Sequence, residues 1–137
     1  MKRSEIREAV FLVLFRSEFN KPSEMKDQAD LFFEAEGDDL SVTVSDEDRE
    51  YIENRALDIV SKLPEIDKMI SEKATGWTVE RMGKVDIAII RLAVYEIMFD
   101  DKIPTGVSIN EAVELAKKYG RDESKAFVNG VLAKFAK

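Results

Sequence analysis

The sequence of 137 residues contains no cysteine and no histidine. The absence of cysteine excludes disulfide bonds and thiolate metal sites, and it fits a reducing cytoplasm, where we expect the protein to reside. The absence of histidine removes the commonest general base and the commonest metal ligand. Carboxylates and lysines alone can support catalysis, but the composition favours a protein that is not an enzyme and needs no cofactor.

Long apolar segments are also absent. The longest apolar run covers only residues 9–15, whereas about 20 apolar residues are needed to cross a bilayer. Charged residues flank this run on both sides, including Arg7, Glu8 and Arg16, so the N-terminus is not typical of a signal peptide. We therefore expect no membrane association.

The net charge of −7 is distributed unevenly along the chain. Residues 24–53 contain twelve acids and two bases, a balance of −10, so the rest of the chain carries −7 − (−10) = +3. The last 21 residues hold six bases and two acids, or +4. Charges act on an approaching partner within a Debye length of about 8–10 Å. The basic part can therefore attract a polyanion although the total charge is negative.

Apolar residues recur at helical spacing along most of the chain, and strand-like alternation is confined to residues 40–44. The pattern predicts seven helices, at about residues 5–19, 24–37, 45–63, 64–73, 84–99, 108–119 and from 122 onward, with a short turn at 79–82. No linker is long enough to divide the chain. The sequence thus predicts an all-α fold, a compact single domain over residues 1–137 that forms a bundle of about seven helices.

Local signals suggest where several helices begin and end. Ser108 stands three residues before Glu111, the spacing of a capping box, and Ser45 pairs with Asp48 in the same way. Gly120 is predicted to end the sixth helix in a left-handed conformation. Residues 129–130, Asn-Gly, are expected to let two helices pack closely.

Four segments together carry a family resemblance. IP-x-x-V-x-INEAVELAKKYG at residues 103–120, followed by FVNGVL at 127–132, resembles the NusB family of transcription antitermination factors, and IREAVFLVLF at 6–15 and VDIAIIRLAVYEI at 85–97 agree with it. The resemblance covers nearly the whole chain and is weakest between residues 21 and 45. It implies an all-helical, non-catalytic RNA-binding protein. Such a protein would bind the boxA element of ribosomal RNA leaders together with NusE, a ribosomal small-subunit protein, and modulate termination by RNA polymerase, chiefly in ribosomal RNA operons.

The resemblance also implies an RNA site formed by the first helix and the C-terminal helices. The matching positions are cationic or aromatic: Lys2, Arg3, Arg7, Phe15, Arg91, Lys118, Tyr119 and Phe127. Each has a purely structural alternative. The cations can be solvated charges, the phenylalanines can belong to the core, and Arg91 can pair with a carboxylate such as Glu96 or Asp86.

The basic N-terminal stretch is shorter than is common in the family, and Glu5 and Glu8 interrupt it. Because each lost phosphate contact weakens electrostatic binding, we expect weak RNA binding by the protein alone and dependence on NusE. Glu80 and Asp86 match the region that would contact this basic partner, but they can equally be solvated surface acids.

A second hypothesis keeps the fold and changes the function. Family members occur as monomers and as dimers that cover the RNA face, so the chain could be a protein–protein adaptor or a homodimer with little RNA affinity. Asn110 and Asn129 are predicted to be structural and not catalytic. The acidic run at residues 34–53 lacks the pattern of a calcium-binding loop, and we expect it to form a solvated face.

Overall fold

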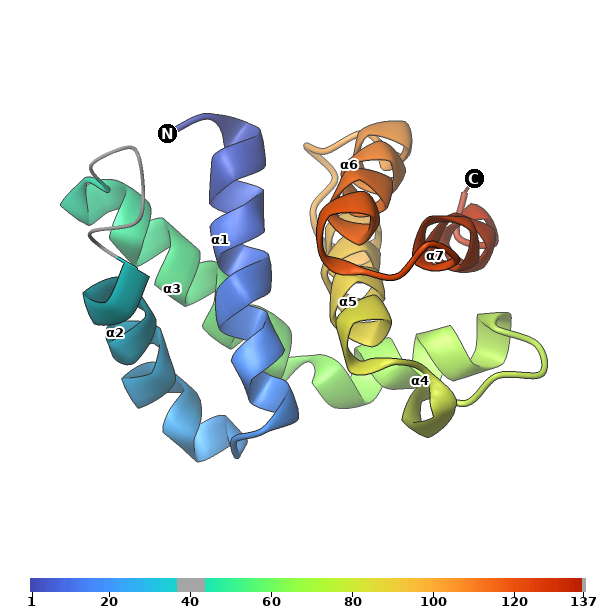
Figure 1. Cartoon of the computed structure of the whole chain (residues 1–137), viewed down its shortest axis with the longest axis horizontal. Coiled ribbons are helices and arrows are strands. Elements are labelled where there is room, and N and C mark those ends of the chain that lie inside the picture. The colour runs from blue at the N-terminus through green and yellow to red at the C-terminus, as the bar shows by residue number, and fades with distance from the viewer. Residues whose placement is uncertain (37–43, 137) are drawn as a thin grey trace. The chain divides into compact units, whose positions relative to one another are not determined.

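The computed structural model describes residues 1–36 and 44–136, and this part of the chain is all-α (Figure 1). It contains seven α-helices and three short 3₁₀ helices, and no β-strand is found in the described residues. The α-helices are α1 (Arg3–Phe15), α2 (Met25–Glu36), α3 (Asp46–Ser61), α4 (Leu63–Lys73), α5 (Lys84–Phe99), α6 (Thr105–Tyr119) and α7 (Ser124–Ala133). The 3₁₀ helices are η1 (Arg16–Glu18), η2 (Pro22–Glu24) and η3 (Val79–Arg81). The predicted fold class is therefore confirmed.

The chain divides into two compact units, Met1–Ser61 and Lys62–Lys137. The first unit contains α1, α2 and α3, and the second contains α4 to α7. The expectation that the whole chain behaves as a single domain stays a prediction. The strand-like stretch at residues 40–44 lies outside the described residues except for its last member.

In the first unit, α1 packs mainly against α3, and α2 packs against both (Figure 1). Ala9, Val10, Phe11, Val13 and Leu14 of α1 are all buried. Burial on more than one side of a helix is the physical consequence of its nearly continuous apolar run. Phe11 is only 1% exposed, so it is a core residue.

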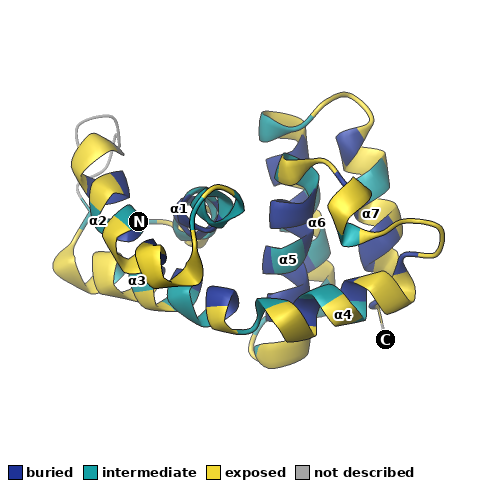
Figure 2. Ribbon diagram, turned by 90° about the horizontal axis from the view of Figure 1, so that it is seen from below, coloured by how far each residue is buried: buried dark blue, intermediate teal, exposed yellow. Residues whose placement is uncertain are grey.

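In the second unit, α5 is the central helix, and α4, α6 and α7 pack around it. Ten of its sixteen residues are buried, and its ribbon is dark along most of its length in Figure 2. The sequence predicted the bounds of this helix correctly, because Gly83 precedes its apolar repeat and the repeat ends at Phe99.

The helix ends predicted from local signals were only partly correct. The Asp48 backbone N–H donates to Ser45 Oγ at 3.1 Å, which confirms Ser45 as a cap of α3. The capping box at Ser108 was wrong, because α6 begins one turn earlier, at Thr105. The Ser108 N–H donates to the Pro104 carbonyl at 3.2 Å, and the side chain is buried inside the helix.

Two glycines also differ from their predicted roles. Gly120 ends α6 with φ −92° and ψ −173°, so it is extended and not left-handed. A Cβ at this position would lie 2.5 Å from Ser124 Cβ and 2.8 Å from the Ala116 carbonyl oxygen, so glycine is required there for close approach. Gly130 shows the opposite, because an added Cβ would meet no atom within 4 Å. The predicted close helix packing at Gly130 was therefore wrong.

Candidate nucleic-acid interface

In the first unit, the predicted cations gather at the beginning of α1. Lys2 and Arg3 are exposed and Arg7 is partly exposed, one helical turn after Arg3. Glu5 has a structural role at this helix start, because its carboxylate accepts a hydrogen bond of 2.8 Å from the Lys2 backbone N–H. A carboxylate bonded to the first N–H groups of a helix satisfies donors that the helix leaves unpaired and complements the helix dipole. The cationic side chains at this end can thus project from a well-formed helix start.

Aromatic rings continue along α1 and η1. The ring of Phe15, which is partly exposed, lies 6.1 Å from that of buried Phe11 and 5.4 Å from that of Phe19, in an edge-on arrangement with Phe19. Phe19 is 63% exposed. Sequence reasoning did not select Phe19, although positions 11, 15 and 19 repeat every four residues. The first unit therefore presents cations at one end of α1 and exposed aromatic surface at the other.

In the second unit, the predicted residues lie near the junction of α6 and α7. Lys118 is exposed, and its Nζ lies 5.4 Å from the ring centroid of Tyr119, within the range of a cation–π contact. Phe127 of α7 contacts Trp77, with ring centroids 5.2 Å apart. Sequence reasoning did not select Trp77. What singles it out is that it is exposed and contacts Phe127, and only the tertiary structure shows this.

Arg91 has a partner within the protein. Its Nε and Nη2 donate to the two carboxylate oxygens of Asp67, both at 2.8 Å. The sequence had suggested carboxylates close to Arg91 in the chain, whereas Asp67 lies 24 residues away on α4. This pair gives Arg91 a structural role. Its contact with RNA stays a prediction.

The other predicted contacts also remain predictions. Glu80 is exposed in η3, and Asp86 is partly exposed in the first turn of α5, so both acids belong to the second unit. The expectation that α1 and the C-terminal helices form one RNA surface concerns residues of both units, and it stays a prediction as well.

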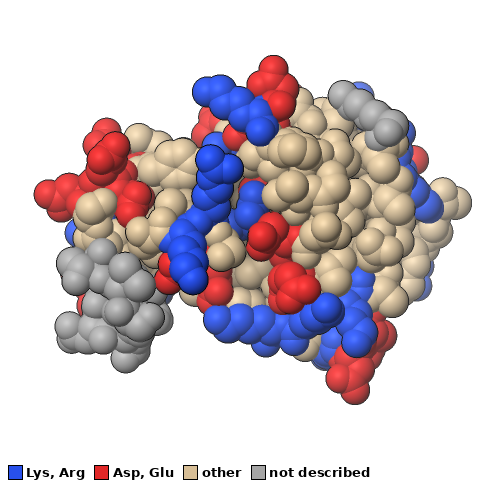
Figure 3. All heavy atoms as spheres, turned by 90° about the horizontal axis from the view of Figure 1, so that it is seen from above, with Lys and Arg blue, Asp and Glu red and all other residues tan. Residues whose placement is uncertain are grey.

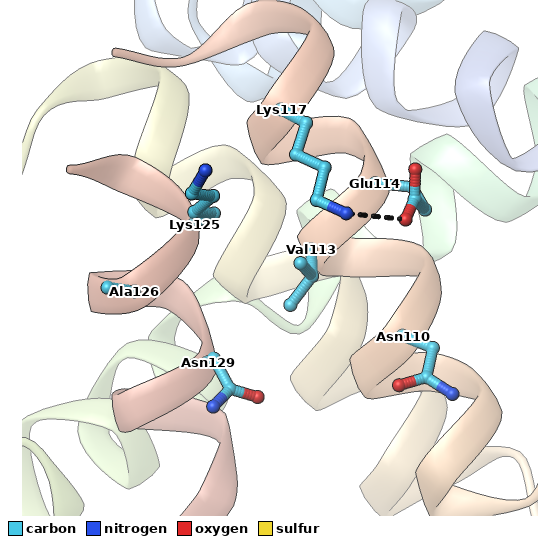
Figure 4. A pocket seen from close by; sticks show the side chains of 7 residues that line it. All are labelled: Asn110, Val113, Glu114, Lys117, Lys125, Ala126 and Asn129. Carbon is cyan, nitrogen blue, oxygen red and sulfur yellow. Dashed lines mark hydrogen bonds and ion pairs between the residues drawn. The ribbon is translucent and has the colours of Figure 1, made fainter. Parts of the chain in front are cut away.

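Asn110 and Asn129 line an open groove of about 380 Å³ between α6 and α7 (Figure 4). Lys117 and Lys125 contribute cationic side chains to this groove, and Lys117 forms an ion pair of 3.1 Å with Glu114. Asn110 lies in the second turn of α6, since the helix begins at Thr105. Both asparagines are exposed.

The described acids among residues 24–53 lie in η2, α2 and α3. Acidic side chains gather on the left of the molecule in Figure 3. Lys26 Nζ lies 2.8 Å from Glu53 Oε1 and 3.3 Å from Asp30 Oδ1, and Arg49 Nη2 lies 3.3 Å from the same Asp30 oxygen. Hydrogen bonds to Glu53 and then to Asp30 raise the pKa of Lys26 above its ordinary value. Asp30 of α2 and Glu53 of α3 thus each form an ion pair that links α2 to α3.

A metal site and a membrane-spanning helix are two other features that a chain of this kind can carry. In residues 1–36 and 44–136, no group of three or more acidic side chains is placed to hold a metal ion. None of the helices in the same ranges is both long and apolar enough to cross a bilayer.

Comparison with known proteins identifies the family. The model of the NusB family matches residues 4–137. The transcription antitermination protein NusB of Agathobacter rectalis is 60% identical over 136 residues, covering 99% of this chain and 100% of the relative, and that of Lachnoclostridium phytofermentans is 49% identical, covering 98% of each. The structure of T. maritima NusB matches with a TM-score of 0.85 and 34% identity, covering 99% of this chain and 91% of that chain. A chain in the crystal structure of a plectonemic RNA supercoil matches with a TM-score of 0.78 and 30% identity, covering 97% of this chain and 92% of that chain. The chain therefore belongs to the NusB family of transcription antitermination proteins.

Proposed function

We propose that this protein binds boxA-type RNA together with NusE and modulates termination by RNA polymerase, chiefly in ribosomal RNA operons, as part of an antitermination complex. The observation that carries the RNA proposal is the cationic start of α1, where Lys2 and Arg3 are exposed and Arg7, within two helical turns, is partly exposed. Family membership supports the same role. The proposal includes no catalytic step and no cofactor.

The physical basis of RNA binding is a local cationic surface combined with aromatic rings. Single-stranded RNA is held by cations on its phosphates and by aromatic side chains under its bases. Phe15 in the first unit and Tyr119 and Phe127 in the second are partly exposed, so they can supply such rings. Lys118 adds an exposed cation in the second unit.

The small number of cations makes a partner important. For single-stranded RNA, the slope of log K against log salt is about −0.7 per phosphate contact, so three contacts from Lys2, Arg3 and Arg7 give only about −2. Two weak RNA-binding surfaces held together bind one RNA far better than either does alone. We propose that Glu80 and Asp86 belong to the surface that binds the basic protein NusE.

A fluorescence titration of labelled boxA RNA, with and without NusE and across a series of salt concentrations, tests this function. We expect binding that is weak for the protein alone, stronger with NusE, and weaker as salt rises. The homodimer or adaptor hypothesis predicts that no RNA binds under either condition, and that result would overturn the proposed function.

A further inference from the structure

Trp77 is the only tryptophan of the chain, and it lies between α4 and η3. Its backbone N–H donates to the Ala74 carbonyl at 3.0 Å, and the preceding residue, Gly76, has φ +84°. This left-handed conformation favours glycine, so the chain makes a defined turn just before the indole. Trp77 is nevertheless 48% exposed. An exposed indole offers a large flat face on which a ligand can stack.

The orientation of the indole is fixed by Phe127 of α7. The ring centroids lie 5.2 Å apart and the ring planes meet at 67°, an edge-to-face arrangement that aromatic pairs favour. Both residues belong to the second unit. Because the indole is already held, less conformational entropy is lost when a ligand stacks on it.

Two glycines lie close to this pair in the sequence, and neither is closely packed. An ideal Cβ built at Gly76, which precedes Trp77, or at Gly130 would meet no atom within 4 Å. Gly130 lies three residues after Phe127 in α7, and residues at this spacing share one side of a helix. Glycine inside a helix is unfavourable relative to alanine, and no close packing explains Gly130. An atom added at either glycine would therefore meet open space.

Two lysines lie at the ends of the helices next to this pair, Lys73 at the end of α4 and Lys134 directly after α7. Lys73 is the last residue of α4, and its Nζ lies 6.0 Å from the ring centroid of Phe135. Lys134 is adjacent to Phe135 in the chain and is the C-cap residue of α7, the helix that carries Phe127. Both lysines are exposed. The rings and the ammonium groups together match a nucleotide, which combines a flat base with an anionic phosphate.

We propose that Trp77 and Phe127 form a stacking site for one nucleobase of single-stranded RNA, and that Lys73 and Lys134 bind the neighbouring phosphates. This inference rests on the proposed RNA-binding function. It extends that function to Trp77, Lys73 and Lys134, which the family resemblance did not indicate. An apolar side chain of a protein partner could also contact the rings, but the two lysines favour a nucleotide.

The emission of Trp77 reports directly on this site. Unlabelled boxA RNA is titrated into the full-length protein with NusE present, and emission is recorded for wild type and for Trp77→Phe. The difference between the two is the signal of Trp77, because any emission from NusE is common to both. In parallel, the anisotropy of labelled RNA gives the affinity. We expect RNA to quench Trp77 with the same midpoint as the anisotropy change.

Variants separate stacking from other effects. We expect Trp77→Ala to weaken RNA binding about 5- to 150-fold, the range for loss of one stacked base, and Trp77→Phe to retain most of the affinity. Gly130→Leu places a side chain in the open space on a helix that tolerates leucine, and we expect it to weaken both binding and quenching. Val107→Ala changes another exposed apolar residue of the second unit, 44% exposed, and we expect no effect. Circular dichroism confirms that each variant is folded.

Three results would overturn the stacking site, and they differ in their meaning. If RNA binds without quenching Trp77 and Trp77→Ala binds as well as wild type, the stacking site is wrong while the proposed function stands. If no RNA binds with or without NusE, both are wrong. If NusE alone changes the emission of Trp77 and RNA adds nothing, the rings bind a protein and not a base.

Discussion

Arg91 of α5 holds the Asp67 carboxylate of α4 with two parallel hydrogen bonds, each 2.8 Å long. The two side chains are only 12% and 30% exposed, so solvent screens the pair weakly. A planar guanidinium that faces a carboxylate in this way is among the strongest polar contacts in proteins. The pair joins α4 to the central helix of the second unit.

We expect Asp67→Ala to lower the free energy of unfolding by about 1–3 kcal/mol, because it leaves a largely shielded guanidinium without its carboxylate. Arg91→Lys should also destabilise, since an ammonium group cannot make both bonds in this geometry. Urea denaturation followed by circular dichroism measures both effects. Unfolding curves identical to wild type would show that the ion pair contributes nothing to stability.

The same two variants test whether Arg91 also contacts RNA, as the family resemblance implies. A direct contact predicts that Arg91→Lys weakens RNA binding more than Asp67→Ala does, although both disturb the same ion pair. Equal RNA affinities for the two variants would mean that Arg91 acts only through the fold.

Gly120 and Gly130 should respond oppositely to alanine. Gly120→Ala brings a methyl group into contact distances of 2.5–2.8 Å with Ser124 and the Ala116 carbonyl, and we expect a loss of about 1–3 kcal/mol from this overpacking. Gly130→Ala adds a methyl group in open space within α7, and we expect a gain of about 0.5–1 kcal/mol from helix propensity. Thermal denaturation of both variants checks the signs. A stabilised Gly120→Ala would refute the close approach of α6 and α7.

Ser45 should contribute to the stability of the first unit through its cap of α3. Ser45→Ala removes the acceptor for the Asp48 N–H, and we expect it to cost about 0.5–2 kcal/mol. Ser71→Ala on the exposed side of α4 is a matched control, because the same substitution inside a helix is neutral or slightly stabilising. If both variants unfold at the same urea concentration as wild type, the cap has no energetic value.

Lys26 should make stability depend on pH in the alkaline range. Its pKa in the folded protein is raised above 10.5, chiefly by Glu53 and then by Asp30. The stabilisation is therefore fully present below the unfolded value of about 10.5 and is lost as pH rises through the higher folded value. We expect the effect to be small, because the lysine is exposed. As pH rises above about 10.5, Lys26→Met should lose less stability than wild type. An equal loss in both proteins would contradict a raised pKa for Lys26.

The helices could be predicted because their signal is local and repeated. The bounds of α5 follow from an apolar repeat of sixteen residues that begins after Gly83. Single-residue signals were less reliable. Ser108 has capping-box spacing, but the chain after Pro104 already forms a helix, so Ser108 is an interior residue. Gly120 is required because Ser124 approaches it closely, and no sequence motif reports such a contact.

The candidate site could be predicted only where its residues are neighbours in the chain. Arg3 and Arg7 lie one turn apart on α1, a spacing that is visible in the sequence. The partner of Arg91 is 24 residues away, and Trp77 reaches Phe127 across fifty residues. Such pairs depend on how α4, α5 and α7 pack, and only the structure shows them.

The most direct test of the central claim is the effect of Arg7→Glu on the affinity for boxA RNA in the presence of NusE. The claim is that the cationic start of α1 binds RNA although the whole chain carries −7. Lys102→Glu, at an exposed position in the turn between α5 and α6, changes the net charge by the same amount and is the control. We predict that Arg7→Glu weakens RNA binding at least several-fold and flattens its salt dependence, with unchanged helix content, while Lys102→Glu binds nearly as wild type. Equal affinities for wild type and Arg7→Glu, or equal losses in the two variants, would contradict the claim.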